Sequence, residues 1–249
     1  DVWEDGSNKI AYSKRRRYLL GRETHGLMNY PLRTATLHYL RGGRAEDFRE
    51  TMETVRENYP KPAFYSGLNI LGTHDTPRIL TALGEDGVPS DKLDRAAYRL
   101  SPERLELAMA RLKMAALLLY AFPGSPTLYY GDEAGMEGFE DPMNRRTFPW
   151  GRENQELQSL FKALGALREA RPSLRQGDIR YIGAEDAILV FERTLDGERT
   201  VIALNAGDTE WEIELPWETA FAKELLSFQH FWARDGRVRL SLPPRSGVI

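Results

Sequence analysis

A histidine and an aspartate stand side by side in the stretch Gly72-Thr73-His74-Asp75-Thr76, directly after an apolar run. The Asp75 carboxylate can accept hydrogen bonds from the hydroxyl groups of a polar ligand, and the His74 imidazole can donate one. Alone, such a dipeptide in a loop is more often an ordinary strand end with satisfied hydrogen bonds than part of a catalytic site. The rest of the chain must decide between these two interpretations.

A second candidate lies in the loop from Gly135 to Trp150, where Asp141 and Arg145 stand four residues apart and are framed by Pro142 and Trp150. A carboxylate and a guanidinium held in this way could form a fixed clamp for hydroxyl groups. The alternative is a structural ion pair in a solvated loop, which would contribute little.

Three short apolar runs are predicted to be strands that position these groups, because they alternate with stretches of helical period up to about residue 175. Each run is followed by polar residues, and the carboxyl ends of parallel strands in a β/α barrel converge on one face. The predicted strands are 26–30, 68–71 and 127–130, and the polar residues are Asn29 and Tyr30, then His74, Asp75 and Arg78, then Asp132 and Glu133.

Two helices are well defined by their sequence signals. Ser101 can cap a helix that has Pro102 at its first position and stops at Pro123-Gly124. A second helix is predicted through Leu157 to Leu167, ending by Pro172.

After Pro172 the apolar period changes from 3.6 to 2, which predicts a small all-β domain, a sandwich packed against the α/β part. The dipeptide Asp196-Gly197 is typical of a tight turn between two strands. The predicted strands are 187–191, 200–204, 210–215 and 238–242.

Composition excludes several classes of function. The 249 residues include 34 basic and 37 acidic side chains, a net charge of -3, which gives no electrostatic footprint for nucleic acid or an anionic membrane. Arg15-Arg16-Arg17 is better explained as a solvated helix face. The apolar stretch from Met114 to Phe122 is too short to span a membrane. The lack of cysteine rules out disulfides and favours a cytoplasmic location.

Several motifs resemble the alpha-amylase family of glycoside hydrolases. Tyr129-Tyr130-Gly131-Asp132-Glu133, followed by Asp141-Pro142 and Arg145, resembles the end of that family's catalytic barrel, and the His-Asp stretch resembles its segment at the seventh strand. The form of that stretch, with Leu20-Gly21 through Pro31, is most similar to the neopullulanase and cyclomaltodextrinase branch. The terminal Leu242-Pro243-Pro244 also resembles that family's C-terminal β-domain.

The resemblance implies an α/β fold in which residues 1–174 are the C-terminal part of a (β/α)8 TIM barrel, about strands six to eight, and residues 175–249 a β-sandwich. The first four strands and the nucleophile would then lie outside this chain. We therefore expect a fragment whose missing N-terminal half completes the barrel, because strands six to eight alone would expose two sheet edges.

The resemblance also implies roles for the candidate residues. Members of the family cleave α-glucosidic bonds with retention of configuration, and a third carboxylate, matched here by Asp75, favours the oxocarbenium-like transition state. His74 would contact the sugar at the cleavage point, and Asp141 with Arg145 would hold the next sugar. Asn29 and Tyr30 are further candidates for substrate contact. The chemistry needs no metal and no organic cofactor.

The first residues depart from the family's pattern. Asp1-Val2-Trp3-Glu4-Asp5 resembles the proton-donor segment, in which a glutamate usually stands two residues before the tryptophan, here Trp3. Asp1 is one methylene shorter, and a misplacement of about an ångström can cost about a hundredfold in rate. Glu4 is a weaker candidate, because it lies on the other side of the tryptophan.

The sequence thus predicts a fragment of a retaining hydrolase that acts on maltodextrins, cyclodextrins or pullulan and is inactive as an isolated chain. The resemblance also allows a homodimer. The alternative is a non-catalytic, amylase-like carbohydrate-binding or scaffolding protein, which Asp1 favours. A dinucleotide-dependent enzyme is disfavoured, because no Gly-x-Gly-x-x-Gly turn follows a strand.

Overall fold

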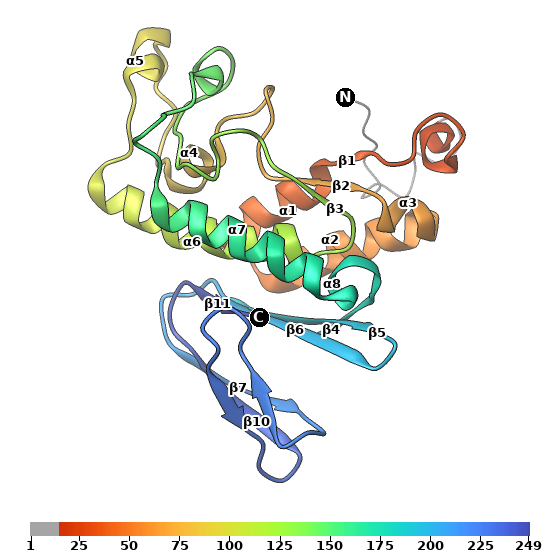
Figure 1. The fold of residues 1–249 in the computed structure, drawn as a ribbon. Helices are drawn as coiled ribbons and strands as arrows, with labels where there is room; N and C mark the ends of the chain where they lie inside the picture. The colour runs from red at the N-terminus through yellow and green to blue at the C-terminus, as the bar shows by residue number, and fades with distance from the viewer. Residues whose placement is uncertain (1–14) are drawn as a thin grey trace.

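The computed structural model describes residues 15–249, which form an α/β part followed by a β-domain (Figure 1). The α/β part contains a three-stranded parallel sheet in the order β1 (Met28–Asn29), β2 (Leu68–Ile70), β3 (Ser125–Thr127). Leu68 pairs with Met28 on one side and with Ser125 on the other. The expected parallel strands are therefore confirmed, although all three are short.

Helices separate and flank these strands, as successive β/α units require. Two 3-10 helices, η1 (Arg15–Leu20) and η2 (Met143–Arg145), accompany the α-helices. The α-helices are α1 (Tyr30–Leu40), α2 (Ala45–Asn58), α3 (Lys61–Tyr65), α4 (Ile79–Gly84), α5 (Lys92–Ala97), α6 (Pro102–Ala121), α7 (Gln155–Ala170) and α8 (Pro172–Gln176).

The two helices predicted from sequence signals are confirmed. The Ser101 hydroxyl accepts a hydrogen bond from the Arg104 amide at 3.3 Å, and α6 ends at Ala121, two residues before Pro123. Helix α7 begins after Asn154, whose side chain accepts from the Leu157 amide at 3.0 Å. Both caps satisfy backbone N–H groups that a helix start leaves free.

The third strand lies earlier than expected. We predicted residues 127–130, whereas β3 spans Ser125–Thr127 and the chain leaves the sheet after it. The guanidinium of Arg78 lies 4.3 Å from the ring centre of Tyr129 and 4.5 Å from that of Tyr130. These cation-π contacts hold both tyrosines away from strand geometry, although their β-propensity favours a strand.

The β-domain consists of antiparallel sheets in which the strands predicted from the period of 2 are present. Asp196 and Gly197 form the turn between β5 and β6, both with positive φ (47° and 84°). One sheet has the order β11-β6-β5-β4, and the pairs β10-β7 and β8-β9 form two smaller sheets. The strands are β4 (Asp178–Glu185), β5 (Ile188–Leu195), β6 (Glu198–Asn205), β7 (Trp211–Pro216), β8 (Phe221–Lys223), β9 (His230–Trp232), β10 (Arg237–Leu242) and β11 (Ser246–Val248).

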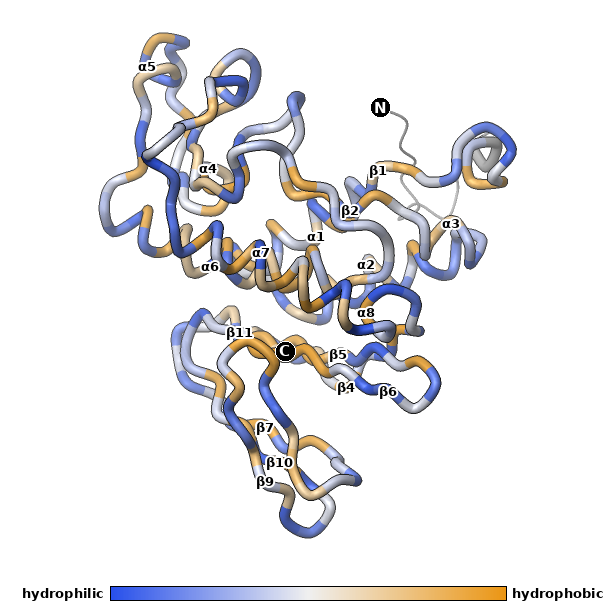
Figure 2. The backbone as a smooth tube through the Cα atoms, in the orientation of Figure 1, coloured by the Kyte–Doolittle hydropathy of each residue, from blue (hydrophilic) through white to orange (hydrophobic). Residues whose placement is uncertain are grey.

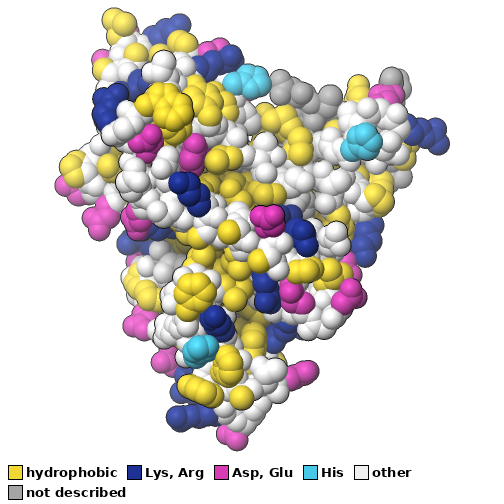
Figure 3. All heavy atoms as spheres, viewed as in Figure 1, with side chains coloured by type: hydrophobic (Ala, Val, Ile, Leu, Met, Phe, Trp, Pro, Cys, Tyr) yellow, Lys and Arg dark blue, Asp and Glu magenta, His cyan; other side chains and the backbone are white. Residues whose placement is uncertain are grey.

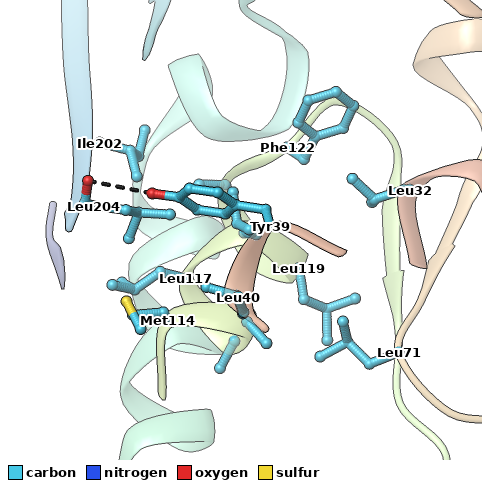
Figure 4. Close-up of a cluster of buried hydrophobic side chains, with 14 of the residues drawn as sticks. Leu32, Tyr39, Leu40, Leu71, Met114, Leu117, Leu119, Phe122, Ile202 and Leu204 are labelled. Carbon is cyan, nitrogen blue, oxygen red and sulfur yellow. Dashed lines mark hydrogen bonds between the residues drawn. The ribbon is translucent and has the colours of Figure 1, made fainter. Parts of the chain in front are cut away.

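One continuous core joins the two parts of the chain. The Phe122 ring lies 6.1 Å from that of Phe48 and 6.3 Å from that of Phe191 on β5, so the contacts pass from helices to sheet. The hydroxyl of the buried Tyr39 donates to the carbonyl oxygen of Ala187 at 2.7 Å and also to that of Leu204 at 3.4 Å, the contact drawn in Figure 4. Figure 2 shows hydrophobic segments where the helices meet the sheet.

Both sheet edges of the α/β part lack a further strand within residues 15–249, because β1 and β3 each pair only with β2. In parallel sheets such edges are normally covered or continued. No helix of the described residues is both long and apolar enough to cross a membrane.

Candidate active site

The His-Asp segment begins directly after strand β2 and is shaped by two threonines. The Thr73 amide donates to the Thr76 hydroxyl at 3.0 Å, and the Asp75 amide donates to the Thr73 hydroxyl at 3.2 Å. Just before the segment, the Leu71 carbonyl accepts from Arg33 Nε at 2.8 Å. Local side-chain to backbone hydrogen bonds of this kind fix a tight loop at the strand end.

Four residues predicted from the sequence lie together, with Arg145 at the centre of the group. Its Nε lies 3.2 Å from Asp141 Oδ1, and its Nη2 lies 4.0 Å from Asp75 Oδ1. On the other side of Asp75, Oδ2 lies 3.2 Å from His74 Nε2. The side chains of these four residues are between 41% and 56% exposed, so they are open to a ligand.

This arrangement is a clamp in which one guanidinium holds two carboxylates. A guanidinium has five N–H donors in a rigid fork, so Arg145 can contact both carboxylates. Carboxylate oxygens that remain free can accept hydrogen bonds from neighbouring hydroxyl groups of a polyol. The cluster is therefore suited to a sugar. A structural ion pair of Asp141 and Arg145 alone does not describe the arrangement fully, because Asp75 also faces the arginine.

Asn144 connects the two segments that carry these residues, although no sequence signal points to it. Its side chain is fully buried, and Nδ2 lies 2.8 Å from the carbonyl oxygen of His74 and 2.9 Å from that of Thr76. The neighbouring residue in η2 is Arg145. Asn144 therefore fixes the distance between Arg145 and the loop of Asp75.

Arg78 has a structural position beneath the site rather than a place at its mouth. It is fully buried, and its Nη1 donates to the Tyr130 carbonyl and lies 3.2 Å from Asp132 Oδ1. Burial raises the pKa of the Asp132 carboxyl to about 7, against the opposing effect of Arg78. Asp132 Oδ2 and Glu133 Oε2 are also buried and have no hydrogen-bond partner among residues 15–249. Asp132 is therefore enclosed within the fold rather than open to a ligand.

Asn29 also has a structural position. Its side chain accepts from the Leu32 amide at 3.1 Å as the cap of α1, and its Nδ2 donates to Asn69 Oδ1 at 3.0 Å. Tyr30 is the first residue of α1 and is half-buried. Asp1 and Trp3 lie outside the described residues, so the roles expected for them stay predictions.

No group of three or more His, Cys, Asp or Glu residues between positions 15 and 249 is arranged to hold a metal ion. The Arg145 guanidinium lies beside both Asp141 and Asp75 and offsets part of their negative charge, and carboxylate oxygens held in this way can accept hydrogen bonds from hydroxyl groups.

Comparison with known proteins shows two family matches that cover nearly the whole chain. Residues 7–177 match the alpha-amylase catalytic domain, and residues 179–249 match the C-terminal domain of maltogenic amylases. The boundary between the two matches lies where α8 gives way to β4.

Curated relatives include an amylopullulanase, a cyclomaltodextrinase and a neopullulanase. The amylopullulanase of Thermoanaerobacter thermohydrosulfuricus is 32% identical over 93% of this chain and 17% of its own length. The cyclomaltodextrinase of Geobacillus thermopakistaniensis is 32% identical, with 93% and 37% covered. Neopullulanase 2 of Thermoactinomyces vulgaris is 27% identical, with 100% and 39% covered. The chain thus spans well under half of these relatives.

A crystal structure of the Nostoc punctiforme debranching enzyme, soaked with acarbose, superimposes on this chain with a TM-score of 0.76 and 28% identity. The match covers 100% of this chain and 49% of the enzyme. The fold described above therefore corresponds to about half of a known chain.

Proposed function

Because the chain belongs to the alpha-amylase family of glycoside hydrolases, we propose that it supplies part of the active site of a retaining enzyme that cleaves α-glucosidic bonds. The observation that carries this proposal is the cluster of Asp75, from the loop after β2, with Asp141 and Arg145, from the segment after β3. Maltodextrins, cyclodextrins and pullulan are the proposed substrates, since relatives are named cyclomaltodextrinase and neopullulanase.

In this proposal Asp75 is the third carboxylate of the reaction. Positive charge develops on the sugar ring in the transition state, and a fixed carboxylate nearby stabilises it more than it stabilises the neutral substrate. Asp75 also accepts hydrogen bonds from sugar hydroxyls, while His74 donates one to the same sugar. The loop bonds from Thr73 and Asn144 hold Asp75 in place before the substrate binds.

Asp141 and Arg145 hold the next sugar toward the non-reducing end. The 3.2 Å contact between them fixes both side chains, which lowers the entropy that binding must remove. Positioning by a remote sugar can account for a large part of the rate, because reacting groups then meet in the correct geometry.

The remaining catalytic groups are proposed to lie elsewhere. Asp1 is the proposed proton donor, and Trp3 is proposed to contact substrate beside it. The nucleophile is proposed to come from barrel strands that pair with the open edges of β1 and β3, so this chain alone is not expected to hydrolyse a glucan. This view is supported by the small share of its relatives' length that the chain covers, 17% of the amylopullulanase and 39% of the neopullulanase. The proposed domains are residues 1–174, the partial barrel, and residues 175–249, the β-domain.

The experiment that tests this function follows the anomeric configuration of the product. The natural polypeptide that contains this chain is incubated with cyclomaltodextrin or pullulan, and proton NMR records the first sugar released. A retaining enzyme releases the α-anomer first. Early appearance of the β-anomer contradicts the proposal. If sugar binds but none is released, the non-catalytic alternative that Asp1 favours is the better account.

A further inference from the structure

One face of the β8-β9 hairpin consists of aromatic and polar side chains open to solvent. Phe221 is paired with Trp232, and Lys223 with His230, so all four point to the same side of this two-stranded sheet. Trp232 is 69% exposed and Phe221 40%, whereas Phe231 on the opposite side packs against the core of the β-domain. We refer to the side with Phe221, Lys223, His230 and Trp232 as the hairpin face.

The rings of the hairpin face are inclined to one another. Phe221 and Trp232 have ring centres 5.5 Å apart and planes at 60°, and Phe221 and His230 have centres 4.8 Å apart at 89°. These edge-to-face contacts fix the orientation of the rings, so the hairpin face has its shape before any ligand binds.

Phe228 extends this surface from the turn that joins the two strands. It is 64% exposed, and its φ of 62° lies in the left-handed region, which a bulky residue seldom adopts. The Lys223 ammonium lies 4.6 Å from the centre of its ring. The left-handed conformation costs stability for a phenylalanine, and backbone strain of this kind clusters at ligand sites.

The turn itself is firmly anchored. The buried Glu224 carboxylate accepts from the amides of Leu226 at 3.0 Å and Ser227, and from the amide of Ile249 at 3.3 Å. Phe228 is thus held outward by a fixed loop, rather than exposed because the loop lacks structure.

The chemistry of this surface fits a sugar chain. Phe221, Phe228 and Trp232 are among the exposed large hydrophobic residues of the chain, and the β-domain, residues 178–249, exposes large aromatic but no large aliphatic side chains. The flat, electron-rich face of a ring attracts the C–H groups of a pyranose, while Lys223 and His230 can donate hydrogen bonds to hydroxyls at the edge. Inclined rings suit an α-linked glucose chain, which curves, better than a flat β-linked chain.

We propose that the hairpin face and Phe228 form a second, non-catalytic binding site for α-glucan chains. The choice of α-glucan as the ligand rests on the proposed function. Figure 1 places β7 and β10 at the end of the molecule away from α4 and α5, Figure 2 shows β9 beside them, and hydrophobic side chains gather over that end in Figure 3. A long glucan held there has a raised local concentration at the candidate active site.

The test compares the migration of variants in native gels that contain amylose. Phe228→Asn removes the ring but suits the left-handed turn, so this variant folds even if a larger change would not. We expect Trp232→Ala and Phe228→Asn to raise the dissociation constant for amylose by at least about tenfold, since aromatic anchors carry most of the affinity at such sites. Trp211→Ala removes another exposed tryptophan, 47% exposed on β7, and should leave retardation unchanged.

Equal retardation of Trp232→Ala and Trp211→Ala would overturn this proposal, as would equally strong retardation of the unaltered protein by hydroxyethyl cellulose. If Trp232→Ala abolished self-association in the ultracentrifuge without affecting retardation, the face would instead bind a second copy of the chain. Failure of this proposal and failure of the proposed function can be distinguished, because gel retardation measures binding and requires no turnover. If the unaltered protein hydrolyses no glucan, but amylose still retards it in a way that depends on Trp232, only the proposed catalytic function is rejected.

Discussion

The side-chain amide of Asn144 lies 2.8 Å from the carbonyl oxygen of His74, and so joins the loop of Arg145 to the loop of Asp75. The same Nδ2 faces the carbonyl oxygens of Thr73 and Thr76. The distance between Asp75 and Arg145 is therefore set by one buried donor group rather than by the two charged residues alone.

Asn144→Asp should weaken both the fold and the site. The substitution keeps the shape but replaces a donor with an acceptor facing carbonyl oxygens, which we expect to lower the free energy of unfolding by about 1–3 kcal/mol. Urea denaturation measures this change. Asn154→Asp is the matched control, because aspartate caps helix α7 as well as asparagine does. Equal stability of the two variants would show that Asn144 does not hold the loops together.

Gly72 allows the His-Asp segment to lie directly on Asp132. A Cβ atom at this position would lie 2.5 Å from Asp132 Oδ2. Since Asp132 is buried and cannot move outward, we expect Gly72→Ala to cost about 1–3 kcal/mol of stability. Gly87→Ala serves as the control, because a Cβ there meets no atom within 4 Å. The thermal midpoints of the two variants give the comparison, and no difference between them would contradict this close approach.

Asp132 should make stability depend on pH. Its pKa is raised by burial from its ordinary value of 3.8 to about 7, so between these values the folded protein holds a proton that the unfolded chain releases. The free energy of unfolding should therefore fall as pH rises from about 4 to about 7, by up to about 1.4 kcal/mol per pH unit. Below this range the contribution of Asp132 is constant.

Asp132→Asn should lack this decline, because an amide does not titrate. Urea denaturation of both proteins at several pH values between 4 and 8 measures the difference, and Asp196→Asn, which keeps an equally good turn residue, controls for the loss of an aspartate. Identical pH slopes for the unaltered protein and Asp132→Asn would show that the carboxyl titrates in its ordinary range.

Tyr39 should contribute to the attachment of the β-domain. Tyr39→Phe removes the hydroxyl that donates to Ala187 and Leu204 and leaves two carbonyl oxygens with one donor fewer. We expect a loss of about 1–3 kcal/mol in chemical denaturation. Tyr98→Phe, at a half-buried tyrosine, is the control, and a similar small effect of both substitutions would argue against a stabilising role of the Tyr39 hydroxyl.

Local signals were sufficient to predict part of this fold. Ser101 and Pro102 mark the start of α6, Asp196-Gly197 marks a turn, and both are determined by neighbours in the sequence. Residue type and spacing singled out the four residues of the cluster, and the resemblance of a few motifs assigned roles to them. Contacts between distant segments were not predictable, because Tyr129 and Tyr130 leave the sheet to pack on Arg78, and Asn144 binds carbonyl groups 68 to 71 residues earlier in the chain.

The central claim is that Asp75 is a catalytic carboxylate of an α-glucan hydrolase. The most direct measurement is kcat for cyclomaltodextrin hydrolysis by the natural polypeptide that contains this chain, with Asp75→Asn compared with Asp196→Asn. We expect Asp75→Asn to lower kcat by at least about a hundredfold, because the neutral amide cannot stabilise positive charge in the transition state, and Asp196→Asn to leave kcat unchanged. Comparable kcat values for the two variants would contradict the claim.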